Sequence, residues 1–193
     1  MDYSIKEKAL ADKVPIIKDG GLAFLLSYIR DNDVKSILEL GTAVGYSSSQ
    51  MAMISRDIHI DTLEKDQKMY DQAINNIINQ GLSEQISVHF GPIEEYRTTK
   101  MYDLIFVDAA KAQYPRYLEQ FLPNLKDEGA MVFDNMVFHG LIYEVEKIGN
   151  RNTRSLVRKI NRFRETVQKD NRFDIIFYDN VGDGILLLRR RNT

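Results

Sequence analysis

The feature that most constrains the fold of this chain is a repeated alternation of short apolar runs with helical patterns. Two of the runs, Leu104-Ile105-Phe106-Val107 and Met131-Val132-Phe133, lack polar alternation, which is typical of strands covered on both faces. The pattern predicts strands at 34–40, 58–63, 86–90, 104–107, 130–133, 175–178 and 184–188. It predicts helices at 46–55, 66–80, 114–122 and 153–168. The fold class is therefore expected to be doubly wound α/β, with a seven-stranded, mostly parallel sheet and helices on both faces.

The two ends of the chain add detail to this prediction. Only residues 179–183 join the last two predicted strands, which is too short for a parallel crossover, so the last strand should pair antiparallel. Residues 4–30 have helical spacing, and Pro15 and Gly20-Gly21 are expected to break them into two helices. A length of 193 residues suits one domain, so we expect a single domain over 1–193 with residues 1–30 as an N-terminal helical cap.

Composition excludes several classes of protein. The chain has no cysteine, which removes disulfides, thiolate nucleophiles and cysteine zinc sites. Its first eight residues include four charged side chains and lack an apolar signal core, and no apolar run approaches the length of a membrane span. We therefore expect a soluble protein of the cytoplasm. The net charge of −2 conceals a division: residues 150–193 carry 11 Lys and Arg against 5 Asp and Glu, net +6, and residues 1–149 carry 15 against 23, net −8. An anionic partner would meet the C-terminal quarter.

The first predicted strand ends in a glycine turn. Gly41 and Gly45 let the backbone turn sharply, and Ser47 stands at the start of the next helix, where backbone N–H groups attract an anion. The plainer alternative is a tight turn with a serine cap. The spacing differs from the GxGxxG of nicotinamide-binding proteins because residue 43 is alanine, and no GK[ST] follows to indicate a phosphate-binding loop.

The second predicted strand ends at Glu64, 23 residues after Gly41. This is close to the spacing at which an acid meets the hydroxyls of a bound ribose. Asp66 is more simply the cap of the next helix, and either acid alone could be a solvated surface group. Together with the glycine turn, they indicate a cofactor that carries adenosine.

Two further strands end in oxygen-bearing side chains. Asp108 follows the 104–107 run, and Asp134 and Asn135 follow the 130–133 run. Because parallel strands end at one edge of the sheet, these oxygens would form a compact set that suits Mg²⁺ or another hard divalent ion. The alternative is that the acids cap following segments or pair with Lys111. The histidines at 59, 89 and 139 have no metal-ligand spacing, and Tyr114 and Tyr117 are expected in the core.

These motifs together resemble a known family. They occur in the order found in class I S-adenosylmethionine-dependent O-methyltransferases, whose fold is Rossmann-like, and specifically in the metal-dependent branch with catechol and caffeoyl-CoA O-methyltransferases. The resemblance runs from about Pro15 to Arg189. The segments that carry it are Glu39-Leu40-Gly41-Thr42-Ala43-Val44-Gly45-Tyr46-Ser47, Glu64-Lys65-Asp66, Gly91-Pro92-Ile93, Phe106-Val107-Asp108-Ala109-Ala110-Lys111 and Phe133-Asp134-Asn135.

The resemblance implies roles for individual residues. It places the cofactor S-adenosylmethionine on Gly41, Ser47 and Asp108, with Glu39 supporting the turn, Glu64 on the ribose, Pro92 and Ile93 along the adenine, and Ile17 closing over it. It places Mg²⁺ on Asp108, Asp134 and Asn135, and makes Lys111 the catalytic lysine, with Asp108 also catalytic. Ala43, where many methyltransferases have glycine, and Gly91-Pro92-Ile93, where bacterial relatives often have an acid, depart from the family pattern.

Within that branch the chain looks most like bacterial tRNA 5-hydroxyuridine methyltransferases, which form 5-methoxyuridine at the wobble position. The segments 14–17, 38–43, 134–141, 156–160 and 181–185 carry this likeness. The basic residues of the C-terminal quarter could then hold the phosphate backbone of tRNA, although the same cluster could be a solvated helix face. The residues that form this cluster are Arg151, Arg154, Arg158, Lys159, Arg162 and Arg164. A homodimer, common in this branch, is also expected.

Two alternatives stand beside this prediction. The first is a small-molecule catechol or phenol O-methyltransferase with the same site. The second, from a different class, is a non-catalytic nucleotide-binding module or a nicotinamide enzyme. The set of Asp108, Lys111, Asp134 and Asn135, and the absence of GxGxxG, both weaken the second alternative.

Overall fold

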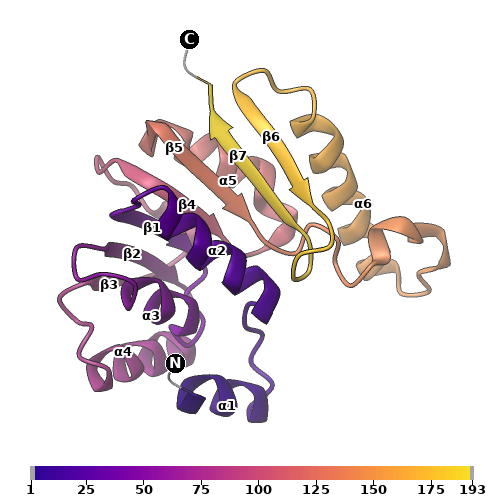
Figure 1. Ribbon diagram of the computed structural model, residues 1–193. Helices are drawn as coiled ribbons and strands as arrows, with labels where there is room; N and C mark the ends of the chain where they lie inside the picture. Colours follow the sequence, from indigo (N-terminus) through magenta and orange to yellow (C-terminus); the bar gives the residue numbers. More distant parts are fainter. Residues whose placement is uncertain (1–2, 192–193) are drawn as a thin grey trace.

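In the computed structural model, which describes residues 3–191, seven strands form one sheet in the order β3-β2-β1-β4-β5-β7-β6 (Figure 1). The parallel strands are β1 (Ser36–Leu40), β2 (His59–Glu64), β3 (Ile86–Phe90), β4 (Tyr102–Val107) and β5 (Leu125–Phe133). The remaining two, β6 (Phe173–Tyr178) and β7 (Ile185–Arg190), form an antiparallel pair, and β7 also runs antiparallel to β5. The predicted fold class is confirmed. The ends of the predicted domain, residues 1, 2, 192 and 193, lie outside the described residues.

Helices cover both faces of the sheet (Figure 1). One face carries α2 (Asp19–Asp31), α3 (Tyr46–Ala52) and α4 (Gln67–Asn79), with α1 (Tyr3–Ala11) packed beside them. The other carries α5 (Tyr114–Phe121) and α6 (Arg151–Val167). None of the helices in the described part of the chain is long and apolar enough to cross a membrane.

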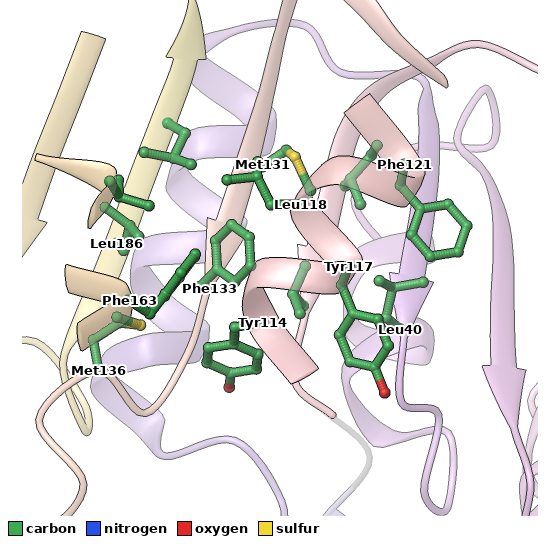
Figure 2. Close-up of a cluster of buried hydrophobic side chains, with 14 of the residues drawn as sticks. Leu40, Tyr114, Tyr117, Leu118, Phe121, Met131, Phe133, Met136, Phe163 and Leu186 are labelled. Carbon is green, nitrogen blue, oxygen red and sulfur yellow. The ribbon is translucent and has the colours of Figure 1, made fainter. Parts of the chain in front are cut away.

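An aromatic cluster fixes α5 and α6 to the sheet. Figure 2 shows Tyr114 of α5 and Phe163 of α6 beside Phe133 of β5, and Tyr117 of α5 beside Leu40 of β1. The ring centroid of Phe133 lies 5.3 Å from that of Tyr114 and 5.2 Å from that of Phe163. Each such side chain contributes about 1.5–3 kcal/mol on full burial. The prediction that both tyrosines belong to the core is confirmed, and their helix is thereby held where β4 and β5 end.

The N-terminal segment differs from its prediction. The break between α1 and α2 includes Pro15 as expected, but Gly20 and Gly21 lie inside the first turn of α2. A Cβ on Gly20 would lie 3.1 Å from the backbone nitrogen of Gly182, and a Cβ on Gly21 would lie 3.3 Å from the side chain of Ile17. The two glycines therefore allow close packing on the loop between β6 and β7 instead of ending a helix.

Candidate active site

A cavity of about 650 Å³ opens where β1, β2, β4 and β5 end, as expected for an open parallel sheet. Eight of the predicted site residues line it: Ile17, Gly41, Ser47, Glu64, Ile93, Asp108, Lys111 and Asn135. Three others do not. Pro92 is exposed outside it, and Glu39 and Asp134 are buried behind the lining residues. The structure thus brings most of the predicted site to one place.

The glycine turn after β1 brings backbone directly against β4. Gly41 has φ +105°, and a Cβ there would overlap the backbone carbonyl oxygen of Asp108. Only glycine fits this approach. Ala43 also has a positive φ of +47°, which glycine adopts more easily than alanine. The positive φ explains why many methyltransferases have glycine at the position that Ala43 occupies in this chain.

The buried carboxylate of Glu39 holds the glycine turn through hydrogen bonds to neighbouring hydroxyls. Glu39 is fully buried and accepts hydrogen bonds from the hydroxyls of Ser47, at 2.5 Å, of Thr62, at 2.6 Å, and of Ser48. Burial raises the pKa of Glu39 to about 7, against the lowering effect of these three hydroxyls. The carboxylate therefore links β1, β2 and the first turn of α3 beneath the cavity lining.

The acid at the end of β2 holds backbone from two segments. One oxygen of Glu64 accepts the N–H of Ala43 at 2.8 Å, and the other accepts the N–H groups of Lys65 and Asp66, both at 2.9 Å. A carboxylate has about four acceptor positions and three are used here, so Glu64 can still accept a hydrogen bond from one hydroxyl group of a ligand in the cavity. Asp66 accepts from the N–H of Met69 and caps α4, as predicted.

The acids after β4 and β5 lie at the polar end of the cavity, Asp108 in its lining and Asp134 buried behind it. The Lys111 ammonium lies 3.4 Å from the Asp108 carboxylate, and both side chains are about one-quarter exposed. Asp134 is 1% exposed, and its Oδ2 has no hydrogen-bond partner. Burial and the nearby charge of Asp108 raise the pKa of Asp134 to about 7. A buried oxygen without a donor is unfavourable unless something else satisfies it.

The donor set suits a hard divalent cation. Asp108, Asp134 and Asn135 would offer two carboxylates and an amide oxygen, and a bound cation would satisfy the Oδ2 of Asp134, which has no hydrogen-bond partner. The described residues contain no group of three or more His, Cys, Asp or Glu side chains placed to hold a metal, so a site here depends on the amide of Asn135. We conclude that these residues fit Mg²⁺.

Sequence reasoning missed part of the lining. Lys18, Phe138, His139 and Asp183 also line the cavity. Asp183 is buried and lies in the loop between β6 and β7, and Lys18 immediately precedes α2. Two signals in the sequence could have pointed to Asp183: it stands between two glycines in a short antiparallel connection, and it belongs to segment 181–185, which carries part of the family likeness.

Comparison with known proteins identifies the family. A family model described as O-methyltransferase matches residues 5–191. The chain belongs to the O-methyltransferase family. The prediction of an O-methyltransferase is confirmed, and the alternatives of a nicotinamide enzyme and a non-catalytic module are not supported. A caffeoyl-CoA O-methyltransferase of Populus kitakamiensis is 30% identical over 186 residues, which cover 92% of this chain and 77% of that protein.

Solved structures agree with the assignment of this O-methyltransferase. A provisionally named caffeoyl-CoA O-methyltransferase from Staphylococcus aureus is 35% identical with a TM-score of 0.94, covering 98% of this chain and 91% of that one. An SAH-bound methyltransferase from Podospora anserina is 26% identical with a TM-score of 0.78, covering 89% of this chain and 78% of that one. The fold and the family thus rest on nearly the whole chain.

Proposed function

We propose that this O-methyltransferase moves the methyl group of S-adenosylmethionine to a substrate hydroxyl oxygen with the help of Mg²⁺. The observation that carries the proposal is the orphaned carboxylate oxygen of Asp134 beside Asp108, at the same end of the cavity as Lys111. The SAH bound in the structure of the Podospora relative supports the choice of cofactor.

The cofactor would occupy the glycine-turn side of the cavity. Gly41 and Ser47 would contact its methionine part, Glu64 would accept a hydrogen bond from a ribose hydroxyl, and Ile93 would lie along its adenine. Ile17 is 4% exposed and lines the cavity from the N-terminal segment, so it would exclude water from the bound cofactor. Glu39 acts only through the turn, because it does not line the cavity.

The other end of the cavity would handle the acceptor oxygen. Methyl transfer requires this oxygen in line with the methyl group, and a neutral hydroxyl is a weak nucleophile. A divalent ion held by Asp108, Asp134 and Asn135 would lower the pKa of that hydroxyl. Lys111 would accept the proton of the substrate hydroxyl, or it would stabilise the negative charge that develops on the hydroxyl oxygen as that proton leaves. A substrate with two adjacent oxygens suits this arrangement.

We propose 5-hydroxyuridine of tRNA as that substrate, because it offers adjacent O4 and O5 and because helix α6 carries a basic surface. Helix α6 follows the segment that leads away from β5 (Figure 1). It carries a hollow of about 460 Å³. We call this hollow the α6 basic surface. It is lined by Arg151, Arg154, Ser155, Arg158, Lys159 and Arg162. Five cations around one hollow suit a phosphate backbone.

Local contacts decide which cations are available on the α6 basic surface. Arg158 pairs with exposed Glu146 at 2.9 Å, a contact that contributes little in water. Arg154 donates to the carbonyl of Ile148, a neutral acceptor that leaves its positive charge in place. Arg164, which the sequence grouped with this cluster, instead pairs with Asp179 at 2.8 Å and is 14% exposed. It does not belong to the surface.

The alternative is a small catechol or phenol substrate, which the names of the caffeoyl-CoA relatives favour. The two functions separate by mass spectrometry of tRNA nucleosides from cells with and without the gene. The tRNA function predicts loss of 5-methoxyuridine and its return with the wild-type gene, whereas unchanged 5-methoxyuridine would leave the small-molecule function. The homodimer and the cytoplasmic location stay predictions.

The α6 basic surface has its own test within the tRNA function. Replacing Arg151 and Arg162 together by alanine should weaken tRNA binding and reduce its salt dependence by about one unit of slope for each phosphate that is no longer neutralised. Lys169→Ala is the matched control, because Lys169 is exposed in the same part of the chain but lies outside the hollow. Equal effects of the two changes would contradict this surface.

A further inference from the structure

Asp183 connects three segments that are distant in sequence. Its carboxylate is 3% exposed and accepts from the Lys18 ammonium at 2.8 Å, the backbone N–H of His139 at 2.9 Å and the side-chain amide of Asn135 at 3.3 Å. Both oxygens are used, because Lys18 and His139 contact Oδ1 and Asn135 contacts Oδ2. Burying a carboxylate to this degree costs several kcal/mol unless such partners compensate it.

The backbone leaves Asp183 little freedom to move away from Asn135. The N–H of Met136 donates to the carbonyl of Gly184, and the N–H of Val137 donates to the carbonyl of Asp183, both at 2.9 Å. Gly184 has φ +85°, and a Cβ there would overlap Val137. The loop between β6 and β7 is therefore locked against the segment that follows β5.

The hydrogen bond from the Asn135 amide to Asp183 determines which atom of the Asn135 side chain is available to a ligand. An asparagine side chain has one acceptor oxygen and two N–H donors on a single nitrogen. Because that nitrogen faces Asp183, the oxygen is directed elsewhere, and Asn135 lines the cavity with Asp108. Asn135 itself has φ +59°, a conformation that needs support from its surroundings.

Lys18 adds the N-terminal segment to the arrangement. It comes directly after Ile17, which lines the cofactor side of the cavity, and its ammonium lies 2.8 Å from the buried Asp183 carboxylate. The His139 ring lies 3.5 Å from the same oxygen. Without Lys18, a nearly buried negative charge would lack its compensating partner.

We infer that Asp183 is a positioning residue that turns the Asn135 amide so that its oxygen faces a divalent cation, with Lys18 as the counter-charge. The inference rests on the proposed metal-assisted function. Groups that orient metal ligands typically change metal affinity by about 10–100-fold when they are removed. The ligand itself would still come from Asn135, so Asp183 needs no contact with the ion.

The test is a double-mutant cycle read out by Mn²⁺ affinity in the presence of S-adenosylhomocysteine, which requires no turnover. Asp183→Asn puts an amide N–H₂ opposite one of the existing donors and should weaken Mn²⁺ binding about 10–100-fold. Asn135→Ala should weaken it comparably. Asp183→Asn in the Asn135→Ala background should add no more than about twofold, because Asp183 acts through Asn135.

Each other outcome of the cycle is informative. A full additional loss in the Asn135→Ala background would show that Asp183 acts by charge alone and would overturn the inference. Wild-type Mn²⁺ affinity in Asp183→Asn, with Asn135→Ala weakened, would overturn it and leave the proposed function standing. Absence of Mn²⁺ binding to the unsubstituted protein would overturn both.

Two controls separate positioning from general destabilisation. Asp61→Asn removes another buried aspartate paired with a lysine, Lys100 at 2.8 Å, that does not line the cavity, so Mn²⁺ affinity should not change. Lys18→Met keeps the hydrogen bond between Asp183 and Asn135. Its Mn²⁺ affinity can be measured even if Asp183→Asn does not fold. It should lower thermal stability but retain Mn²⁺ affinity, and a loss as large as that of Asn135→Ala would overturn the inference.

Discussion

The backbone N–H of Ala43 donates a hydrogen bond to the carboxylate of Glu64 at 2.8 Å, joining the turn after β1 to the end of β2. One acid thereby has two tasks: it holds the turn, and it can still accept a hydrogen bond from one hydroxyl group of a ligand. This hydrogen bond holds Ala43 in its left-handed conformation, φ +47°. Cofactor affinity should therefore depend on Glu64 more than on any other acid at the rim.

Glu64→Gln should weaken S-adenosylhomocysteine binding by about tenfold or more, since a hydrogen bond to a charged group contributes about 1.5–3 kcal/mol. The amide would also place an N–H₂ against backbone N–H groups that now meet an oxygen. Calorimetric titration measures the change. Glu95→Gln, at an exposed acid outside the cavity, is the control and should bind as the wild type does.

Gly41→Ala should lower the free energy of unfolding by about 2 kcal/mol or more and abolish cofactor binding, because the added Cβ overlaps the Asp108 carbonyl. Gly81→Ala is the matched control. Its φ is also positive, +69°, but no atom lies within 4 Å of the added Cβ, so only the backbone cost of about 1 kcal/mol applies. Thermal melts compare them at about 3 °C per kcal/mol. Equal losses would contradict the close approach at Gly41.

Much of the fold was predictable because burial on both faces leaves a simple signature. The continuous apolar runs of β4 and β5 indicated central strands, and β3 has its predicted bounds, 86–90. The starts of β4 and β5 were missed because Asp103 and the polar residues 126–128 interrupt the apolar pattern. Gly20-Gly21 was misread as a break because its partner, Gly182, lies far along the chain.

The site was predictable where it depends on local order along a strand end. Gly41, Glu64 and Asp108 each follow or end a strand, so their convergence follows from the parallel sheet. Asp183 was not predictable in this way. Its partner Lys18 is 165 residues away, and the ion pair exists only because α2 packs on the loop between β6 and β7.

Asp134→Asn should stabilise the metal-free protein increasingly as pH rises. Burial, with the charge of Asp108, raises the pKa of Asp134 to about 7, so the folded protein retains a proton that the unfolded chain releases near its ordinary value. Stability is therefore lost between those two values as pH rises, and the asparagine variant avoids this loss.

Thermal melts at pH 5 and pH 8 in chelator measure this effect of Asp134. The melting temperature of Asp134→Asn should exceed that of the wild type by more at pH 8 than at pH 5. Asp71→Asn, at an exposed acid, should show no such trend. A constant difference between Asp134→Asn and the wild type at the two pH values would contradict a protonated Asp134 in the metal-free protein.

Asp61→Asn should destabilise the protein by about 2 kcal/mol at pH 7 without changing cofactor binding. Burial acts to raise the pKa of Asp61, but hydrogen bonds from Lys100, His89 and Tyr102 outweigh it and lower the pKa below the usual value. A lowered pKa gives stability that is present above the ordinary range of Asp and disappears as pH falls through the folded value. Melts in acid should therefore show the difference from wild type shrinking, whereas a constant difference would exclude the ionised cluster.

Metal-assisted methyl transfer is tested by following a labelled methyl group from S-adenosylmethionine to tRNA containing 5-hydroxyuridine or to a catechol, in chelator and after Mg²⁺ is restored. The account predicts loss of transfer in chelator, recovery with Mg²⁺, and no recovery for Asp134→Ala while S-adenosylhomocysteine still binds. An Asp134→Ala enzyme that transfers the methyl group at the wild-type rate in chelator would contradict it.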